Sequence, residues 1–288
     1  MTEISASQVK DLREKTGLGL MDCKKALQDS SGDIELAIVN LRKSSALKAE
    51  KKSTRSAAEG IILAETSKEN KVILIEVNCE TDFVSKDKNF IDFCEKASIV
   101  AKSYDLNDGL LDHVNQQLEN DRESLIQKIG ENILIRKVES IEGEVVNFYI
   151  HSNNKIASAV SLNQGSLELG KDIAMHIAAA NPLVVSPKDL SQDLIDKELD
   201  IIRSQVSKEN KPAEIQEKMV TGRLNKYLSE VSLLKQGFVK DPGKSVEAYL
   251  KENNGNVSEF IRLEVGQGIE KEEVDFATEV MSQISDSE

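Results

Sequence analysis

Residues 59–78, EGIILAETSKENKVILIEVN, can be aligned with residues 142–163, EGEVVNFYIHSNNKIASAVSLN, with small gaps. Both segments begin Glu-Gly, run through a strand, turn at Asn-Lys (70–71 and 154–155) and return as a second strand. Apolar runs bounded by polar turn residues are typical of β-hairpins. The chain therefore contains an internal repeat that is built on two hairpins.

Each hairpin is followed by a helical segment and then by one more strand. The helices are expected at 89–104 and 169–180, and the closing strands at 133–139 and 260–265. This order predicts an α+β fold with two related subdomains, each containing an antiparallel sheet. The first subdomain is expected to cover residues 56–141, and the second residues 142–185 and 232–270.

The segment before the repeat, residues 1–55, is predicted to form a small three-helix domain with a polar linker. The glycines of TGLGL (16–20) break the first helix, and Asp33 is placed to cap the third. A bundle of this size has little stability alone, so we expect a docking module. Its last part, RKSSALKAEKKSTR (42–55), carries a net charge of +5 and indicates a solvated linker or helix face more than a nucleic-acid contact.

A helical insertion interrupts the second copy at residues 186–231. Ser186, Pro187 and Asp189 resemble a capping box, and Pro212 lies where a second helix begins. An antiparallel helical hairpin with two apolar faces is expected either to dimerise or embrace a partner, or to fold back on its own sheet. The last segment, 271–288, is predicted to be a C-terminal module with one amphipathic helix.

The composition is that of a soluble globular protein, with 39% hydrophobic and 30% charged residues among 288. A formal net charge of -13 argues against a general nucleic-acid binder. Three cysteines without paired spacing indicate a reducing compartment. Neither a signal peptide nor an apolar run of membrane-spanning length is found, so we expect a cytoplasmic protein with no membrane contact.

The sequence offers little that could carry catalysis. It contains no GxxxxGK[ST], GxSxG or HExxH motif, and its cysteines and histidines do not form a ligand-spaced cluster. His176 lies in an alanine-rich helix, which is typical of a packed histidine, whereas His151 is at a hairpin turn and is expected to be exposed. We therefore predict a protein that acts by binding, not an enzyme, with no cofactor.

The stretch NCETDFV (78–84) lies between a predicted buried strand and a helix, where rigid scaffolds often display recognition residues. Phe83 either turns back into the core or is held out as a wedge, and ordinary burial preferences favour the core. Asp82 either accepts a hydrogen bond that fixes such a wedge or caps the following turn.

Five motifs together resemble one family along nearly the whole chain. They are LREKTGLGLMDCKKAL (12–27), NCETDFVSKD (78–87), IGENILIRKV (129–138), HIAAANP (176–182) and FIRLEVGQGIEK (260–271). They resemble the translation elongation factor Ts family, the nucleotide exchange factors of elongation factor Tu. The resemblance implies a ubiquitin-associated-like N-terminal domain, two core subdomains, a coiled-coil dimerisation hairpin at 186–231 and a C-terminal helical module.

The resemblance also implies site residues. Those expected to disturb the Mg²⁺ site of elongation factor Tu in its GDP form are Thr81, Asp82, Phe83 and Val84. Phe83 would be pushed between two helices of the partner's GTPase domain, contrary to its burial preference. Direct nucleic-acid binding is not expected, and a homodimer would form through residues 186–231.

Further partner contacts implied by the resemblance are Lys24, His151 and Val239. The family often has an apolar residue after the equivalent of Val239, but this chain has Lys240. Two other classes of function remain open at this point. One is an adaptor that binds without changing nucleotide kinetics, and the other is an enzyme that uses His151 with nearby carboxylates.

Overall fold

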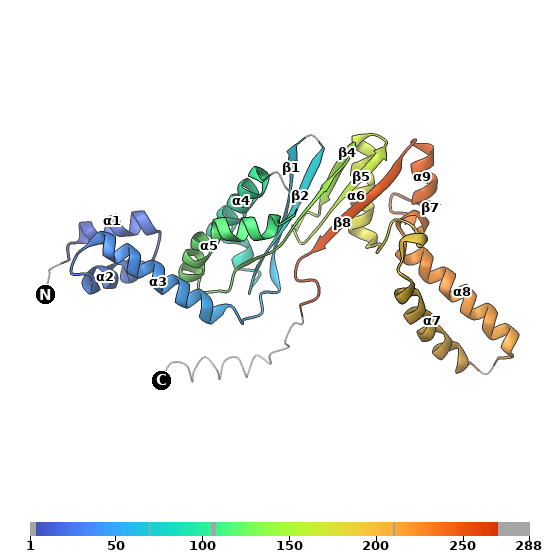
Figure 1. Ribbon diagram of the computed structural model, residues 1–288, viewed down its shortest axis with the longest axis horizontal. Coiled ribbons are helices and arrows are strands. Elements are labelled where there is room, and N and C mark those ends of the chain that lie inside the picture. Colours follow the sequence, from blue (N-terminus) through green and yellow to red (C-terminus); the bar gives the residue numbers. More distant parts are fainter. Residues whose placement is uncertain (1–3, 69, 105–107, 210, 270–288) are drawn as a thin grey trace.

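The computed structural model describes residues 4–68, 70–104, 108–209 and 211–269. Figure 1 shows an elongated molecule, with a helical bundle at one end, sheets in the middle and a helical hairpin at the other end. The expected combination of helices with antiparallel sheets is confirmed. Within the described ranges, no helix has the length and apolar character that crossing a bilayer would require.

Three helices form the N-terminal bundle: α1 (Ala6–Thr16), α2 (Leu20–Asp29) and α3 (Ile34–Lys52). Their apolar faces meet in one small core. The buried members of this core are Val9, Leu12, Leu18, Cys23, Ala26, Leu27, Ala37 and Leu41. These residues therefore form the expected three-helix arrangement.

Local capping explains where these helices begin and end. Ser5 and Gln8 form a reciprocal capping box, in which each side chain accepts a hydrogen bond from the other residue's backbone N–H. Gly17 ends α1 with a φ of 68°, a conformation that glycine adopts without steric cost. Asp33 accepts a hydrogen bond from the backbone N–H of Leu36 at 3.0 Å, so the predicted cap of α3 is confirmed.

Helix α3 extends well beyond the bundle core. Most of the basic segment 42–55 is its C-terminal half, so this segment is a helix face. Ser45 and Ala49 are buried where α3 packs against α5 (Leu110–Ile129). Because these small side chains lie four residues apart, they share one face and let the two helices approach closely. One unbroken helix therefore joins the bundle to the sheets.

Two three-stranded antiparallel sheets form the middle of the molecule. The first contains β1 (Glu59–Lys68), β2 (Lys71–Cys79) and β3 (Leu134–Glu142), in that order. The second contains β4 (Val145–Ile150), β5 (Ile156–Gln164) and β8 (Asn256–Glu264), in that order. In both sheets the second strand of the hairpin, β2 or β5, lies in the centre. The closing strand, β3 or β8, pairs with it at the edge of the sheet. The predicted hairpins and closing strands are therefore confirmed.

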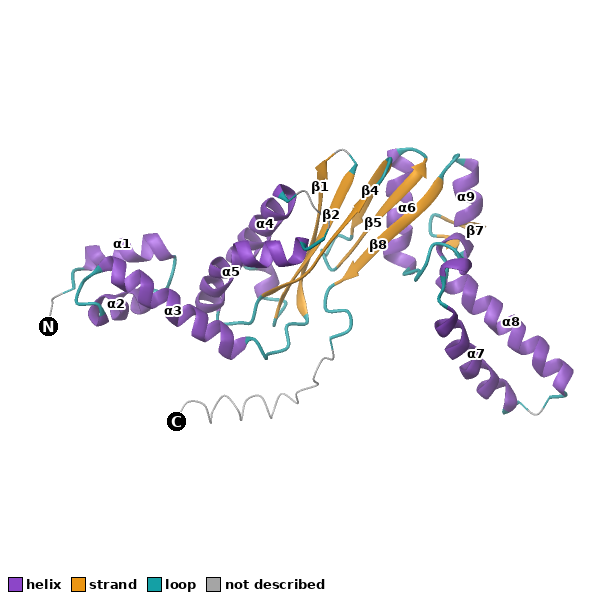
Figure 2. Ribbon diagram, viewed as in Figure 1, coloured by secondary structure: helices purple, strands orange, loops and turns teal. Residues whose placement is uncertain are grey.

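The two sheets lie between layers of helices, as Figure 2 shows. Ile73, Ile75 and Val77 of β2 pack in one core with α5 and with α4 (Lys88–Ser103). Alternate side chains of the same strand form a second core with β5 and β8. Helix α6 (Leu167–Ala180) covers the far side of the second sheet. Because β2 is buried on both faces, apolar residues occupy consecutive positions in KVILIEV.

Some elements had no counterpart in the sequence analysis. Helix α5 follows α4 and contributes to the same core. Between the insertion and β8, the chain forms β6 (Gly237–Phe238), β7 (Asp241–Ser245) and α9 (Val246–Glu252). Helix α5 shows an apolar stripe, whereas the two very short strands carry almost no periodic signal.

The insertion forms a hairpin of α7 (Gln192–Ser207) and α8 (Ala213–Val231). The predicted capping box of Ser186 and Asp189 is confirmed and opens a single 3-10 turn. The apolar cluster of the hairpin, around Ile202, Val206 and Val220, includes no residue from either sheet. Of the two expectations, folding back on its own sheet is therefore wrong. The predicted tail helix at 271–285 lies outside the described residues.

We predict that Gly60→Ala destabilises the fold, whereas Gly222→Ala does not. Gly60 has a φ of 145°, and a Cβ there would lie 2.1 Å from the carbonyl oxygen of Val77. The clash should lower the free energy of unfolding by about 1–3 kcal/mol. Gly222 lies in α8 with no atom within 4 Å of an added Cβ, so alanine should add about 0.5–1 kcal/mol there. Urea denaturation followed by circular dichroism measures both, and equal stability of the two variants would contradict this account.

Candidate functional site

The loop that follows β2 presents Phe83 to solvent. The chain leaves the strand at Cys79 and forms a 3-10 turn, η1 (Val84–Lys86), before α4 begins. Phe83 is 81% exposed, whereas Ser85 is buried and Val84 packs against the core beneath. The ordinary burial preference of phenylalanine is therefore overturned here. The reason is local, because Val84 and Ser85 occupy the inward positions of the turn and leave Phe83 at its outer side.

Glu131 holds this loop through three hydrogen bonds. One carboxylate oxygen accepts from the backbone N–H groups of Glu80 and Thr81 at 3.1 and 3.0 Å. The other accepts from the hydroxyl of Thr81 at 2.7 Å. Hydrogen bonds from backbone N–H groups to an ionised acceptor are among the stronger ones in proteins. The sequence analysis included Glu131 in a motif but gave it no role.

A second set of contacts ties the same loop to the end of α3. The carboxylate of Glu80 accepts from the backbone N–H of Asn132 at 2.6 Å and lies 3.6 Å from the guanidinium of Arg55. The amide of Asn132 in turn donates to the carbonyl of Arg55 at 2.9 Å. The base of the loop is thus fixed from two sides, and its conformation does not depend on Phe83.

Asp82 lies beside Phe83 and is exposed. Its carboxylate accepts from the ammonium of Lys86 at 2.9 Å, and this hydrogen bond holds the pKa of Asp82 below its usual value. The Ser85 hydroxyl donates to the backbone carbonyl of Asp82 at 2.7 Å. The side chain of Asp82 does not cap the 3-10 turn that follows, so the expectation that Asp82 caps this turn is wrong. The Asp82 carboxylate accepts a hydrogen bond from Lys86, and its expected role in fixing a wedge stays a prediction.

Cys79 ends the strand directly behind this loop. Burial raises the pKa of its thiol to about 12, and the carboxylate of Glu131 adds to the effect. A thiol with so high a pKa is a poor nucleophile at neutral pH. Its sulfur lies 3.2 Å from the carbonyl of Thr81, which is a further contact to the base of the loop. Cys79 therefore supports the loop and offers no chemistry.

The structure brings the His151 turn to the same end of the sheets. His151 is exposed, and its Nδ1 lies 3.3 Å from the hydroxyl of Tyr149. Lys155, on the other side of the turn, donates to the carboxylate of Glu59 and to the carbonyl of Gly60, both at 2.8 Å. Gly60 pairs with Asn78 at the end of β2. Two of the predicted contact regions therefore adjoin, although they lie in different sheets.

Lys24 and Val239 lie in other parts of the molecule. Lys24 is exposed on α2 in the N-terminal bundle. Val239 follows β6 and is 43% exposed. The next residue, Lys240, is held by an ion pair with Asp172 of α6 at 2.5 Å. The predicted site residues thus form one adjoining group and two separate regions.

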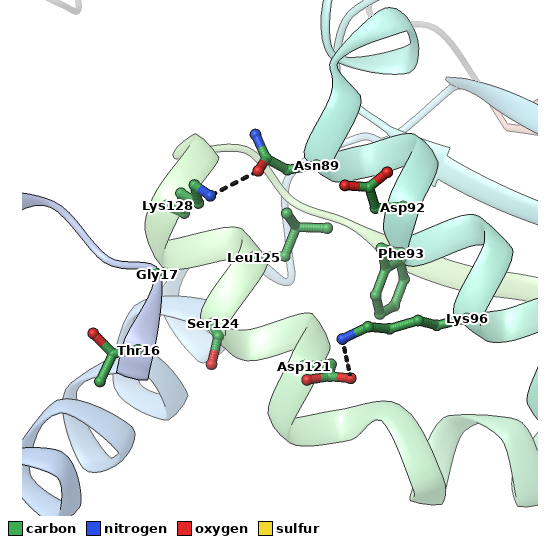
Figure 3. A pocket seen from close by; sticks show the side chains of 10 residues that line it. All are labelled: Thr16, Gly17, Asn89, Asp92, Phe93, Lys96, Asp121, Ser124, Leu125 and Lys128. Atoms are coloured by element: carbon green, nitrogen blue, oxygen red, sulfur yellow. Dashed lines mark hydrogen bonds and ion pairs between the residues drawn. The ribbon is translucent and has the colours of Figure 1, made fainter. Parts of the chain in front are cut away.

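A groove of about 250 Å³ lies between the Gly17 turn and helices α4 and α5 (Figure 3). Its two lysines are already engaged across the groove, Lys128 with Asn89 at 2.7 Å and Lys96 with Asp121 at 2.9 Å. In the part of the chain that the structure describes, no group of His, Cys, Asp and Glu could hold a metal ion. We assign the groove no ligand.

We predict that Glu131→Ala loosens the loop that carries Phe83. The change leaves the backbone N–H groups of Glu80 and Thr81 without their acceptor, so the free energy of unfolding should fall by about 1–3 kcal/mol. Amide hydrogen exchange at these two positions should also accelerate. The control is Glu144→Ala, at an exposed position between β3 and β4. Unchanged hydrogen exchange at both amides in the Glu131 variant would disprove the role of Glu131 in holding the loop.

Comparisons with known proteins agree with this architecture. The family model described as Elongation factor TS matches residues 80–267. The chain is 52% identical over 289 residues to Elongation factor Ts of Teredinibacter turnerae, covering 99% of this chain and 98% of that protein. It is 52% identical over 281 residues to Elongation factor Ts of Marinobacter nauticus, covering 97% of both chains. With Elongation factor Ts of Hahella chejuensis it shares 50% identity over 286 residues, 99% of both chains. The chain therefore belongs to the elongation factor Ts family, whose members act in protein biosynthesis.

Proposed function

We propose that this protein is the guanine nucleotide exchange factor of translation elongation in its cell. It binds elongation factor Tu carrying GDP, promotes release of the GDP and stays bound until GTP binds. Membership of the elongation factor Ts family supports this function. The observation that carries it is the exposure of Phe83 on a loop whose base is hydrogen-bonded from two sides.

The exposed loop acts as a wedge on the partner's Mg²⁺ and phosphate site. Phe83 enters between two helices of the partner's GTPase domain, and Asp82 approaches with it. Thr81 anchors the loop through Glu131, and Val84 anchors it through the core. Because these anchors exist before binding, little conformational entropy is lost when the wedge is inserted.

The free energy gained by burying Phe83 limits how much this residue alone can contribute to GDP release. Burying one phenylalanine side chain contributes about 1.5–3 kcal/mol. Release of a tightly held nucleotide requires a coupling larger than this, since the exchange factor and the nucleotide must weaken each other reciprocally. The rest comes from contacts that add affinity, namely Lys24 on the bundle, His151 beside the wedge and Val239 on the second subdomain. The activity requires no covalent step and no cofactor.

The domain assignments follow from the same proposal. Residues 1–55 dock through the ubiquitin-associated-like bundle, and the subdomains at 56–141 and at 142–185 with 232–270 carry the wedge and the second contact. The hairpin at 186–231 makes a homodimer, and residues 271–288, which lie outside the described residues, are assigned to the C-terminal module. Nucleic acid and membranes have no part in this scheme, which operates in the cytoplasm.

We predict that Phe83→Ala slows GDP release at saturating exchange factor by about 10- to 100-fold, the loss that corresponds to burial of one phenylalanine. Release of a fluorescent GDP from elongation factor Tu is followed by stopped flow. The control is Ile99→Ala. Ile99 is another apolar side chain, 66% exposed on α4, and the release rate with this variant should match that with the native protein. Fast GDP release with the Phe83 variant would show that Phe83 is not the residue that promotes release. Tight binding without faster release by the native protein would support an adaptor instead.

We also predict that Ile201→Lys converts a dimer into a monomer. Ile201 on α7 and Ile215 on α8 are 51% and 47% exposed, so the hairpin offers apolar surface to a second copy. A lysine there would have to be desolvated on association, which weakens the dimer. Sedimentation velocity measures the change, with Ile99→Lys on α4 as the control. A native protein that sediments as a monomer would contradict the proposed dimer.

A further inference from the structure

His176 is a buried histidine next to one of the proposed contact residues. It lies on α6, is 1% exposed, and accepts a hydrogen bond at Nδ1 from the backbone N–H of Val239 at 3.1 Å. Its Nε2 lies 3.0 Å from the side-chain oxygen of Gln236. Both ring nitrogens are therefore engaged by the short segment that carries Val239. The sequence analysis expected a packed histidine here, and the structure confirms the packing.

The hydrogen bonds around Gln236 fix which ring nitrogen carries the proton. The Gln236 amide nitrogen donates to the carbonyls of Glu230 at 2.6 Å and Ala180 at 3.3 Å, so its oxygen faces His176 as an acceptor. The Nε2 of His176 must then donate, and Nδ1 must accept from Val239. Only the neutral imidazole protonated at Nε2 satisfies both contacts.

The segment changes direction at this point. Phe238 is buried, stacks on Tyr249 at a ring distance of 4.1 Å and lies 5.9 Å from the ring of His176. Val239, one residue later, is exposed. The hydrogen bond to His176 is thus made at the residue where the chain turns from the core to the surface.

We propose that His176 is a positioning residue for partner binding, whose neutral imidazole presents Val239 and whose protonation releases it. The inference rests on the proposed function, in which Val239 contacts elongation factor Tu. A proton on Nδ1 would face the N–H of Val239, so that two donors would meet and the hydrogen bond would be lost. Binding through the second subdomain would then weaken as the solution becomes acidic.

The surroundings favour the neutral form at neutral pH. Burial lowers the pKa of His176 below 6.5, while the hydrogen bond with Gln236 opposes the shift. The neutral form and its bond are therefore fully present above about pH 6.5. They are lost as the pH falls through the lowered pKa. The charged and titratable groups on the packed elements include Asp172 of α6 with its partners Lys240 and Tyr249, and Arg262 of β8 with Glu264.

Two substitutions at His176 separate its two hydrogen bonds. His176→Asn places an oxygen near the position of Nδ1, so it retains an acceptor for Val239 and does not titrate. His176→Gln reaches toward Gln236 and offers no acceptor to Val239. We expect the glutamine variant to bind elongation factor Tu about tenfold more weakly at every pH, the loss that corresponds to one intramolecular hydrogen bond. The asparagine variant should restore most of the affinity.

The test is the dissociation constant for elongation factor Tu at pH 5.5 to 8, with the native protein and both variants. The dissociation constant of the native protein divided by that of the asparagine variant should rise several-fold below pH 6.5. Taking this ratio at each pH cancels every pH dependence that the two proteins share, including that of the partner. The maximal GDP release rate should not follow the ratio, since Phe83 is unaffected. A flat ratio, or equal affinities of the two variants, would overturn the proposal.

A measurement on the free protein keeps this inference distinct from the exchange function. In ¹H–¹⁵N NMR spectra, the amide shift of Val239 should titrate with the pKa of His176 in the native protein and stay constant in the asparagine variant. A Val239 amide that does not respond to pH would refute the positioning role, even if GDP release is accelerated. Failure to accelerate GDP release at any pH, with a titrating Val239 amide, would refute the exchange function instead.

Discussion

Face-to-face packing of the two sheets is the constraint on which the other parts of the molecule depend. The central strands β2 and β5 are each covered on both sides, and their facing side chains form one core with Leu263 of β8. Ala157 and Ala159 on β5 are small, so the sheets can approach closely at this layer. This packing determines which strand ends adjoin, and it is why the His151 turn lies beside the loop that follows β2.

A buried carboxylate links the segment after β8 to the first sheet. Glu76 of β2 is fully buried and accepts hydrogen bonds from Arg136 of β3 and from the backbone N–H of Gly266, each at 2.9 Å. Arg136 also donates to the carbonyl of Gln267 at 2.6 Å. Removing one partner of such a group would leave an uncompensated charge in the core. The segment after β8 is therefore held against the first sheet, which links the two copies of the repeat at their closing strands.

Much of this architecture could be predicted from the sequence, because hairpins and amphipathic helices have clear periodic signals. The repeat at 59–78 and 142–163, the cap at Asp33 and the helical insertion all rest on such patterns. The direction of Phe83 could not be predicted in this way, since burial statistics average over all sites and the answer depends on Val84 and the tight turn. The clamp by Glu131 brings together residues fifty positions apart, and nothing in local sequence indicates which carboxylate reaches which backbone amide.

The unbroken course of α3 has a consequence for how the molecule associates with a partner. Its C-terminal end is held at the base of the loop that carries Phe83, where Arg55 meets Glu80 and Lys52 donates to the carbonyl of Gly130 at 2.5 Å. The helix therefore sets a constant spacing between the bundle and Phe83. When one of the two is bound, the other is kept at a high effective concentration near its own target. Under the proposed function, dissociation then requires both ends to detach within the same short interval, so residence time depends on the stiffness of α3.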